Sequence, residues 1–148
     1  MFKRFGQSRT DISYAPPWLV PNHLKLDYDV LYFRVKSVGN YFVEVVVNTD
    51  TQQRAYVDRE AGKVVYWPEF LLSIHSVEYL EGMDQDVYIK PLTHAGKVNK
   101  TYVFLRPIHI QDDWMRVELL NDDLKSTRQG WIRWRADGRL LISYSLLS

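Results

Sequence analysis

The hydrophobic pattern of the chain consists of short runs of β-branched and aromatic residues separated by polar turn clusters. Residues 42–47 (FVEVVV) and 114–119 (WMRVEL) are two such runs, and this pattern is typical of β-strands. The pairs Ala61-Gly62 and Asp137-Gly138 indicate tight turns between strands, because glycine adopts positive φ without steric cost. The strongest helical signal, at residues 68–72, is long enough for a single turn that a proline opens. The pattern therefore predicts an all-β chain.

The order of strands and turns is repeated within the chain. An offset of 72 residues aligns Phe42 with Trp114, and beyond a longer second loop an offset of 75 aligns Tyr56 with Trp131. This pattern favours duplication of a small fold with one loop insertion, and chance similarity of two β-rich halves is the alternative. We therefore expect an N-terminal segment at 1–23, a first module at 24–75 and a second module at 76–148. The modules are expected to pack on each other, because no flexible linker separates them.

The second half carries an ordered set of short motifs. They are residues 87–91 (VYIKP), 95–97 (AGK), 113–117 (DWMRV) and 130–132 (GWI). This set resembles the bacterial Src-homology-3-like (SH3-like) domain, a small five-stranded barrel. The resemblance spans residues 76–148 and extends more faintly to 24–75, so it implies two SH3-like β-barrels in tandem. It also implies that Trp114 packs across the barrel and that Gly130 lets Trp131 lie against the core.

Composition narrows the class of partner. The chain has 148 residues with 46% hydrophobic, 14% aromatic and 25% charged side chains, which suffices for a core without disulfide or metal staples. A formal net charge of +1 weakens a role in non-specific binding to nucleic acid or anionic membranes. The absence of cysteine excludes disulfides, thiolate metal sites and a cysteine nucleophile. Neither a secretory signal nor a run of about 20 apolar residues is evident, so we expect a cytoplasmic protein.

Catalytic chemistry has little support in the sequence. The four histidines are scattered without metal-ligand spacing, and no nucleophile-elbow or phosphate-cradling glycine motif is present. The carboxylate pairs Asp112-Asp113 and Asp122-Asp123 lie beside strand ends, where acidic residues usually form turns. We therefore expect neither an enzyme nor a bound metal or cofactor.

Aromatic side chains beside arginines are better candidates for a ligand site. If Trp131 fills the core, strand alternation places Trp134 outside it or at the seam between the halves. Rings with guanidinium neighbours can stack on ligands or pair with carboxylates, and packing between the halves is the alternative role. The candidate ligand-binding residues are Trp67, Phe70, Trp134, Tyr144, Arg133 and Arg135.

A proline-rich segment near the N-terminus is a second candidate. Pro16 and Pro17 favour an extended polyproline II conformation, and Trp18 follows them directly. The segment either docks in cis onto an aromatic groove, with Trp18 as its anchor, or is itself presented to a partner.

The function that these features predict is a non-enzymatic interaction module for a protein or peptide ligand. The resemblance implies this role, because SH3-like domains commonly recognise peptides or cell-wall components, although a fold alone does not determine function. One alternative is a structural or regulatory subunit of a larger assembly. The other is a single-stranded nucleic-acid binder, which the interleaved charges of the second half disfavour.

Overall fold

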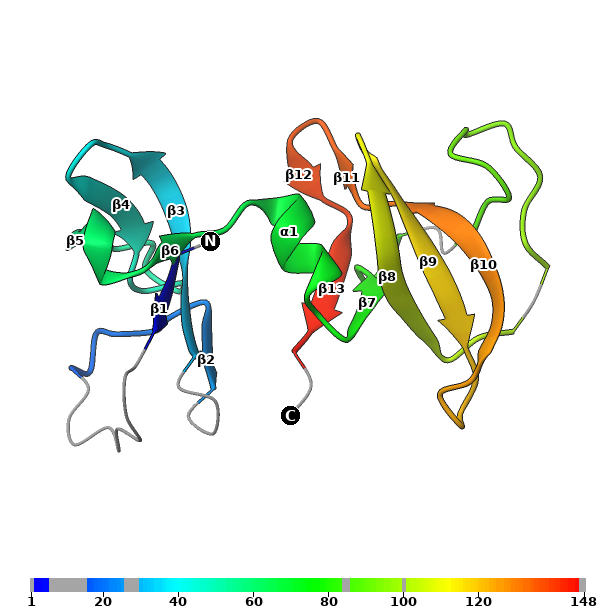
Figure 1. Cartoon of the computed structure of the whole chain (residues 1–148), viewed down its shortest axis with the longest axis horizontal. Helices are drawn as coiled ribbons and strands as arrows, with labels where there is room; N and C mark the ends of the chain where they lie inside the picture. The colour runs from blue at the N-terminus through cyan, green and yellow to red at the C-terminus, as the bar shows by residue number, and fades with distance from the viewer. Residues whose placement is uncertain (1, 6–15, 26–29, 84–85, 100, 147–148) are drawn as a thin grey trace. The chain divides into compact units, whose positions relative to one another are not determined.

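The computed structural model describes residues 2–5, 16–25, 30–83, 86–99 and 101–146. The chain forms two compact units, Met1–Trp67 and Pro68–Ser148, each with its own antiparallel sheet (Figure 1). Helix α1 (Trp67–Leu72) matches the predicted helical turn, and a short 3-10 helix, η2 (Arg59–Ala61), follows the fifth strand. The remaining regular elements of the described ranges are strands, so the predicted all-β class is confirmed. No helix in these ranges combines the length and hydropathy needed to cross a membrane.

The sheet of the first unit has five strands along its main path. They are β1 (Phe2–Phe5), β3 (Val30–Val38), β4 (Phe42–Val46), β5 (Arg54–Asp58) and β6 (Lys63–Val64), in the order β5-β4-β3-β1-β6. A further strand, β2 (His23–Lys25), pairs with β3. Strand β1 comes from the segment 1–23 that the sequence places outside the first module. Because β1 pairs with both β3 and β6, this segment contributes a strand to the first sheet.

The core of the first unit follows from the alternation of side chains along β4. Val43 and Val45 are fully buried and share one face of the sheet with buried Phe33, whereas Phe42 on the opposite face is 56% exposed. Leu19 packs against the same buried cluster. Burying an aliphatic side chain stabilises the fold by roughly 1.5–3 kcal/mol, so the valines of β4 determine which face is left to solvent.

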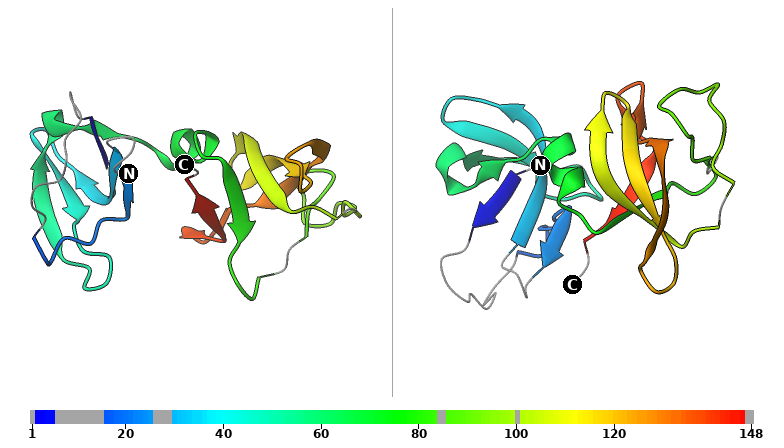
Figure 2. Two further views of the ribbon diagram at one scale, coloured as in Figure 1. Left: turned by 90° about the horizontal axis from the view of Figure 1, so that it is seen from below. Right: turned by 45° about the vertical axis from the view of Figure 1, so that its right-hand side comes forward.

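The sheet of the second unit also has five strands. They are β7 (Ser76–Tyr79), β8 (Phe104–Gln111), β9 (Trp114–Leu120), β10 (Ser126–Arg133) and β13 (Ile142–Ser145), in the order β10-β9-β8-β7-β13 (Figure 1). A short hairpin of β11 (Arg135–Ala136) and β12 (Arg139–Leu140) connects β10 to β13. Residues 86–99 run beside β10 (Figure 2), where Tyr88 and Trp131 exchange two backbone hydrogen bonds of 2.7 Å. None of the sheets formed by the described residues closes into a barrel.

The three-stranded meanders β3–β4–β5 and β8–β9–β10 have the same register. The register of β3 shifts after Val35 and that of β8 shifts after Pro107, which is a β-bulge at the same place with an offset of 72 residues. Phe42 pairs with Asp58 across β4 and β5, and residues 114 and 133 pair in the same way across β9 and β10. A bulge changes which side chains face the core, so matched bulges keep equivalent side chains on equivalent faces.

The two predicted glycine turns have different backbone conformations. Asp137 and Gly138 have positive φ values of 50° and 71°, as a two-residue type I′ hairpin requires. Gly62 is extended, with φ and ψ both −172°, so the expected positive φ at this position is wrong. The 3-10 helix η2 reverses the chain there instead, and Asp58 caps it by accepting a hydrogen bond from the backbone N–H of Glu60.

Candidate functional site

Trp131 and Trp134 lie on opposite faces of the second sheet, but in the reverse of the expected arrangement. Trp134 is 1% exposed and Ile132 is fully buried, whereas Trp131 on the other face of β10 is only partly buried. Gly130 shares the inner face with Ile132, and a Cβ atom at Gly130 would lie 2.3 Å from Cγ1 of Val87. Gly130 therefore makes room for the 86–99 loop, and the prediction that Trp131 fills the core is wrong.

The rings of Trp134 and Phe70 are closed to solvent. The indole Nε1 of Trp134 donates a hydrogen bond of 2.9 Å to the carbonyl of Asp112, and the guanidinium of Arg135 lies 4.8 Å from its ring centre. Phe70 is fully buried and packs edge-to-face on the half-buried Tyr144, with 5.0 Å between ring centres. Both rings are core side chains of the second unit, which corrects the prediction that they face a ligand.

The remaining members of the predicted site lie nearer to solvent. Trp67 is half-buried at the start of α1. Arg133 and Arg135 share one carboxylate: Asp113 lies 2.6 Å from Nε of Arg135 and 3.8 Å from Nη2 of Arg133. The structure therefore brings the two arginines together at the surface, above a tryptophan that is closed to ligands.

The proline-rich segment is docked on the first unit, although not through its tryptophan. The backbone N–H of Leu19 donates a hydrogen bond of 2.9 Å to the carbonyl of Pro16, so these residues form a turn rather than the expected polyproline II helix. Asn48 donates a side-chain hydrogen bond of 2.8 Å to the carbonyl of Trp18. The Trp18 ring is 47% exposed, and Pro17 is also exposed. Leu19 and the backbone therefore anchor the segment, and the predicted Trp18 anchor is wrong.

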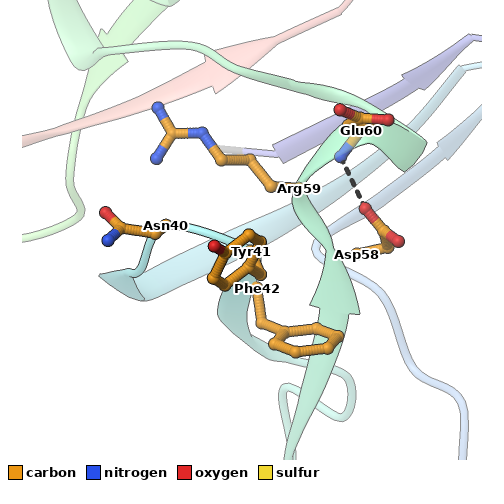
Figure 3. A pocket seen from close by; sticks show the side chains of 6 residues that line it. All are labelled: Asn40, Tyr41, Phe42, Asp58, Arg59 and Glu60. Carbon is orange, nitrogen blue, oxygen red and sulfur yellow. Dashed lines mark hydrogen bonds between the residues drawn. The ribbon is translucent and has the colours of Figure 1, made fainter.

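A pocket of about 690 Å³ opens at the end of the β3–β4 hairpin in the first unit (Figure 3). Tyr41 is 78% exposed and Phe42 is 56% exposed, so two adjacent large rings face solvent. We call this site the turn pocket; it is lined by Asn40, Tyr41, Phe42, Asp58, Arg59 and Glu60. Adjacent exposed aromatic side chains indicate an interaction site more often than a single exposed apolar residue does.

Backbone hydrogen bonds connect the two segments that form the turn pocket. The N–H of Gly39 donates to the carbonyl of Phe42 at 2.8 Å and closes the hairpin. The N–H of Arg59 donates to the carbonyl of Tyr41 at 2.9 Å, and Nη1 of Arg59 donates to the carbonyl of Gly39 at 2.8 Å. These contacts preorganise the pocket, so a ligand need not order it on binding.

The free charges of the turn pocket are negative. Oδ1 of Asp58 accepts the capping hydrogen bond from Glu60 at 2.8 Å, which leaves the second carboxylate oxygen of Asp58 available. Within the described ranges, no ion pair engages either carboxylate, whereas Arg59 is bound to a backbone carbonyl. Aromatic rings beside unpaired carboxylates are suited to binding a Lys or Arg side chain.

Sequence reasoning did not identify the turn pocket. Its signal is present as the adjacent pair Tyr41-Phe42 at a predicted turn and as the charged triplet at residues 58–60. Strand alternation places only one of two adjacent aromatic residues outside the core. The hairpin end exposes both, and only the pairing of Phe42 with Asp58 brings the triplet beside them.

Other features of the described residues do not add a reactive site. No three His, Asp or Glu side chains of these residues gather where they could hold a metal ion. Burial raises the pKa of Tyr79, whose hydroxyl donates a hydrogen bond of 2.7 Å to the carbonyl of Asp86. Burial also raises the pKa of Tyr32 and Tyr102. A raised pKa keeps each phenol protonated at neutral pH, which suits a packed tyrosine and not an activated one.

Comparison of the chain with protein-family models, with curated proteins and with solved structures finds no match. Its function is therefore inferred from the geometry of its own surface.

Proposed function

We propose that the chain is a non-enzymatic module that binds protein segments and is built from two units of the bacterial SH3-like type. The antiparallel order of five strands in each unit supports this proposal, as do the matched bulges of the two meanders. These features also favour duplication of one unit, since unrelated sheets have no reason to share a register over three strands. SH3-like domains commonly act by recognition, and the same role is proposed for this chain.

The turn pocket is the observation that carries the proposal. A cation over an exposed ring gains about 0.5–1 kcal/mol. A hydrogen bond to a charged group adds about 1.5–3 kcal/mol. Tyr41 and Phe42 supply the rings, and Asp58 and Glu60 supply the carboxylates. The proposed ligand is therefore a protein segment that inserts a Lys or Arg side chain between them.

The expected affinity of a single cationic side chain is low. The two contributions together correspond to a dissociation constant on the order of 1 mM. Tighter binding requires flanking residues of the ligand that contact the neighbouring outer face of β4 and β5. On that face, Tyr56 is 73% exposed and pairs with Glu44 of β4.

Fluorescence polarisation of a labelled Gly-Arg-Gly-Arg-Gly peptide tests this proposal. The arginine peptide should bind more tightly than the same peptide with uncharged citrulline in place of arginine. Tyr41→Ser should weaken binding about fivefold, which corresponds to the loss of about 1 kcal/mol of cation–π interaction. Tyr66→Ser removes a ring of similar exposure (73% against 78%) from the same unit and should leave the affinity unchanged. Equal affinities of the two variants, or of the two peptides, would refute the proposal.

A further inference from the structure

The outer face of β4 and β5 has a structural counterpart in the second unit. The matched registers place Trp114 at the position of Phe42 and Trp131 at the position of Tyr56, so both outer faces carry aromatic side chains at equivalent positions. We define the first aromatic face as Phe42, Glu44, Tyr56 and Asp58, and the second aromatic face as Trp114, Arg116, Trp131 and Arg133.

The charged positions of the two aromatic faces have opposite signs. Glu44 is equivalent to Arg116, and Asp58 is equivalent to Arg133. Glu44 is already engaged by an arginine of β5 at 3.5 Å. The carboxylates left for a partner are therefore those of Asp58 and Glu60, at the edge of the first aromatic face and in the turn pocket.

The second aromatic face presents guanidinium groups that lack full partners. Arg116 is exposed, and no ion pair engages it within the described part of the chain. The buried Nε of Arg133 has no hydrogen-bond partner. The carboxylate 3.8 Å from Arg133, that of Asp113, is held more closely by Arg135 at 2.6 Å. An incoming carboxylate would supply the missing partner.

The rings of the second aromatic face are held in place by neighbouring rings. His109 packs edge-to-face on Trp131 with 6.1 Å between ring centres, and Tyr88 packs in the same way on Trp114 at 5.5 Å. The face is therefore ordered before a partner binds, which lowers the entropic cost of association.

We propose that the first aromatic face of one copy of this chain, together with its turn pocket, binds the second aromatic face of another copy. This inference rests on the proposed function, because Arg116 and Arg133 are then the cationic side chains that the turn pocket accepts. Contact between two first faces would bring carboxylates together, and contact between two second faces would bring guanidinium groups together. The contact is therefore heterologous, and it extends from copy to copy unless its rotation closes a ring.

Sedimentation velocity of the full chain tests the proposal. The mean mass should rise above the 17.6 kDa of one chain as the concentration increases from about 10 μM to about 1 mM. It should fall again towards that mass when salt is raised to about 1 M, where charges are screened beyond about 3 Å.

Two double variants identify the surfaces in contact. Asp58→Asn with Glu60→Gln neutralises the turn pocket and leaves a capping oxygen at position 58, and Arg116→Gln with Arg133→Gln neutralises the second aromatic face. Each variant alone should associate about tenfold more weakly than the wild type. An equimolar mixture retains one intact contact, so it should form a complex of two chains and grow no further.

Controls keep the test independent of folding and of total charge. Arg128→Gln with Arg139→Gln removes the same charge from two other exposed arginines of the second unit and should associate like the wild type. Arg116→Gln alone replaces the second double variant if that variant does not fold.

Three results would overturn the proposed self-association: a wild type that stays a single chain at about 1 mM, variants that associate like the wild type, or a mixture that forms no complex. A single-chain wild type that still binds the arginine peptide would overturn the self-association alone. Loss of both interactions would overturn the proposed function as well.

Discussion

Replacement of Gly130 by alanine tests the packing that orients the second aromatic face. The added Cβ atom would lie 2.3 Å from Cγ1 of Val87, 3.1 Å from the carbonyl oxygen of Tyr88 and 3.2 Å from Cγ2 of Val98. A separation of 2.3 Å is too short for two carbon atoms, so either the 86–99 loop or β10 must move. The same segments are joined by the paired hydrogen bonds between Tyr88 and Trp131, so a displacement strains that pairing.

The size of the effect follows from what surrounds the added methyl group. Val87 is 3% exposed and β-branched, so it has few alternative rotamers into which to withdraw. Overpacking a close-packed core costs about 1–3 kcal/mol, and loss of one backbone hydrogen bond adds about 1 kcal/mol. Gly130→Ala should therefore lower the free energy of unfolding by about 2–4 kcal/mol, which lowers Tm by at least about 8 °C for a unit of this size.

Urea unfolding, followed by tryptophan fluorescence, measures this loss against a matched glycine. At Gly96 the added Cβ atom meets only the tip of the Ile89 side chain, at 3.2 Å, so Gly96→Ala should change the free energy of unfolding by less than about 1 kcal/mol. Val87→Ala combined with Gly130→Ala should be more stable than the sum of the single changes predicts, because it removes the closest contact. Equal stability of Gly130→Ala and Gly96→Ala would contradict the inward placement of Gly130 and with it the outward orientation of Trp131.

Three further predictions concern the cores of the two units. Trp134→Ala should lower the free energy of unfolding by about 3–5 kcal/mol in urea unfolding, and a loss below about 1 kcal/mol would show that the ring is not buried. Because burial raises the pKa of Tyr79 above its ordinary value of 10.0, this tyrosine stabilises the fold below pH 10 and that stability is lost as the pH rises further. Between pH 9 and pH 11 Tyr79→Phe should therefore lose less stability than the wild type, and equal losses would contradict the assignment. Leu19→Ala should lower Tm by several degrees and Trp18→Ala by little, for a stability cost of about 1–3 kcal/mol against less than about 0.5 kcal/mol; the reverse order would restore Trp18 as the anchor.

Strand alternation and turn chemistry account for much of the fold. The all-β class, the single helical turn at α1 and the hairpin at Asp137-Gly138 all follow from local residue patterns. The sequence alignment of Phe42 with Trp114 also coincides with equal strand registers, because the positions that alternate between core and solvent are the same in both meanders.

The predictions that fail depend on contacts between distant segments. Trp131 and Trp134 are equally suited to a core, and the choice between them depends on the 86–99 loop approaching Gly130. Local patterns do not contain that approach. The pairing of β1 with β3 joins segments about 30 residues apart, and no local pattern predicts it either. The turn pocket combines a hairpin end with the residues after β5, so it exists only once those strands have paired.

A titration of the ¹⁵N-labelled chain with the peptide acetyl-Gly-Arg-Gly-amide, followed by two-dimensional NMR, tests the central claim most directly. Binding in the turn pocket should shift the backbone amide signals of residues 40–42 and 58–60 in a saturable way. The citrulline peptide should leave these signals in place. Shifts confined to other residues, or equal shifts with both peptides, would contradict recognition of a cationic side chain by the turn pocket.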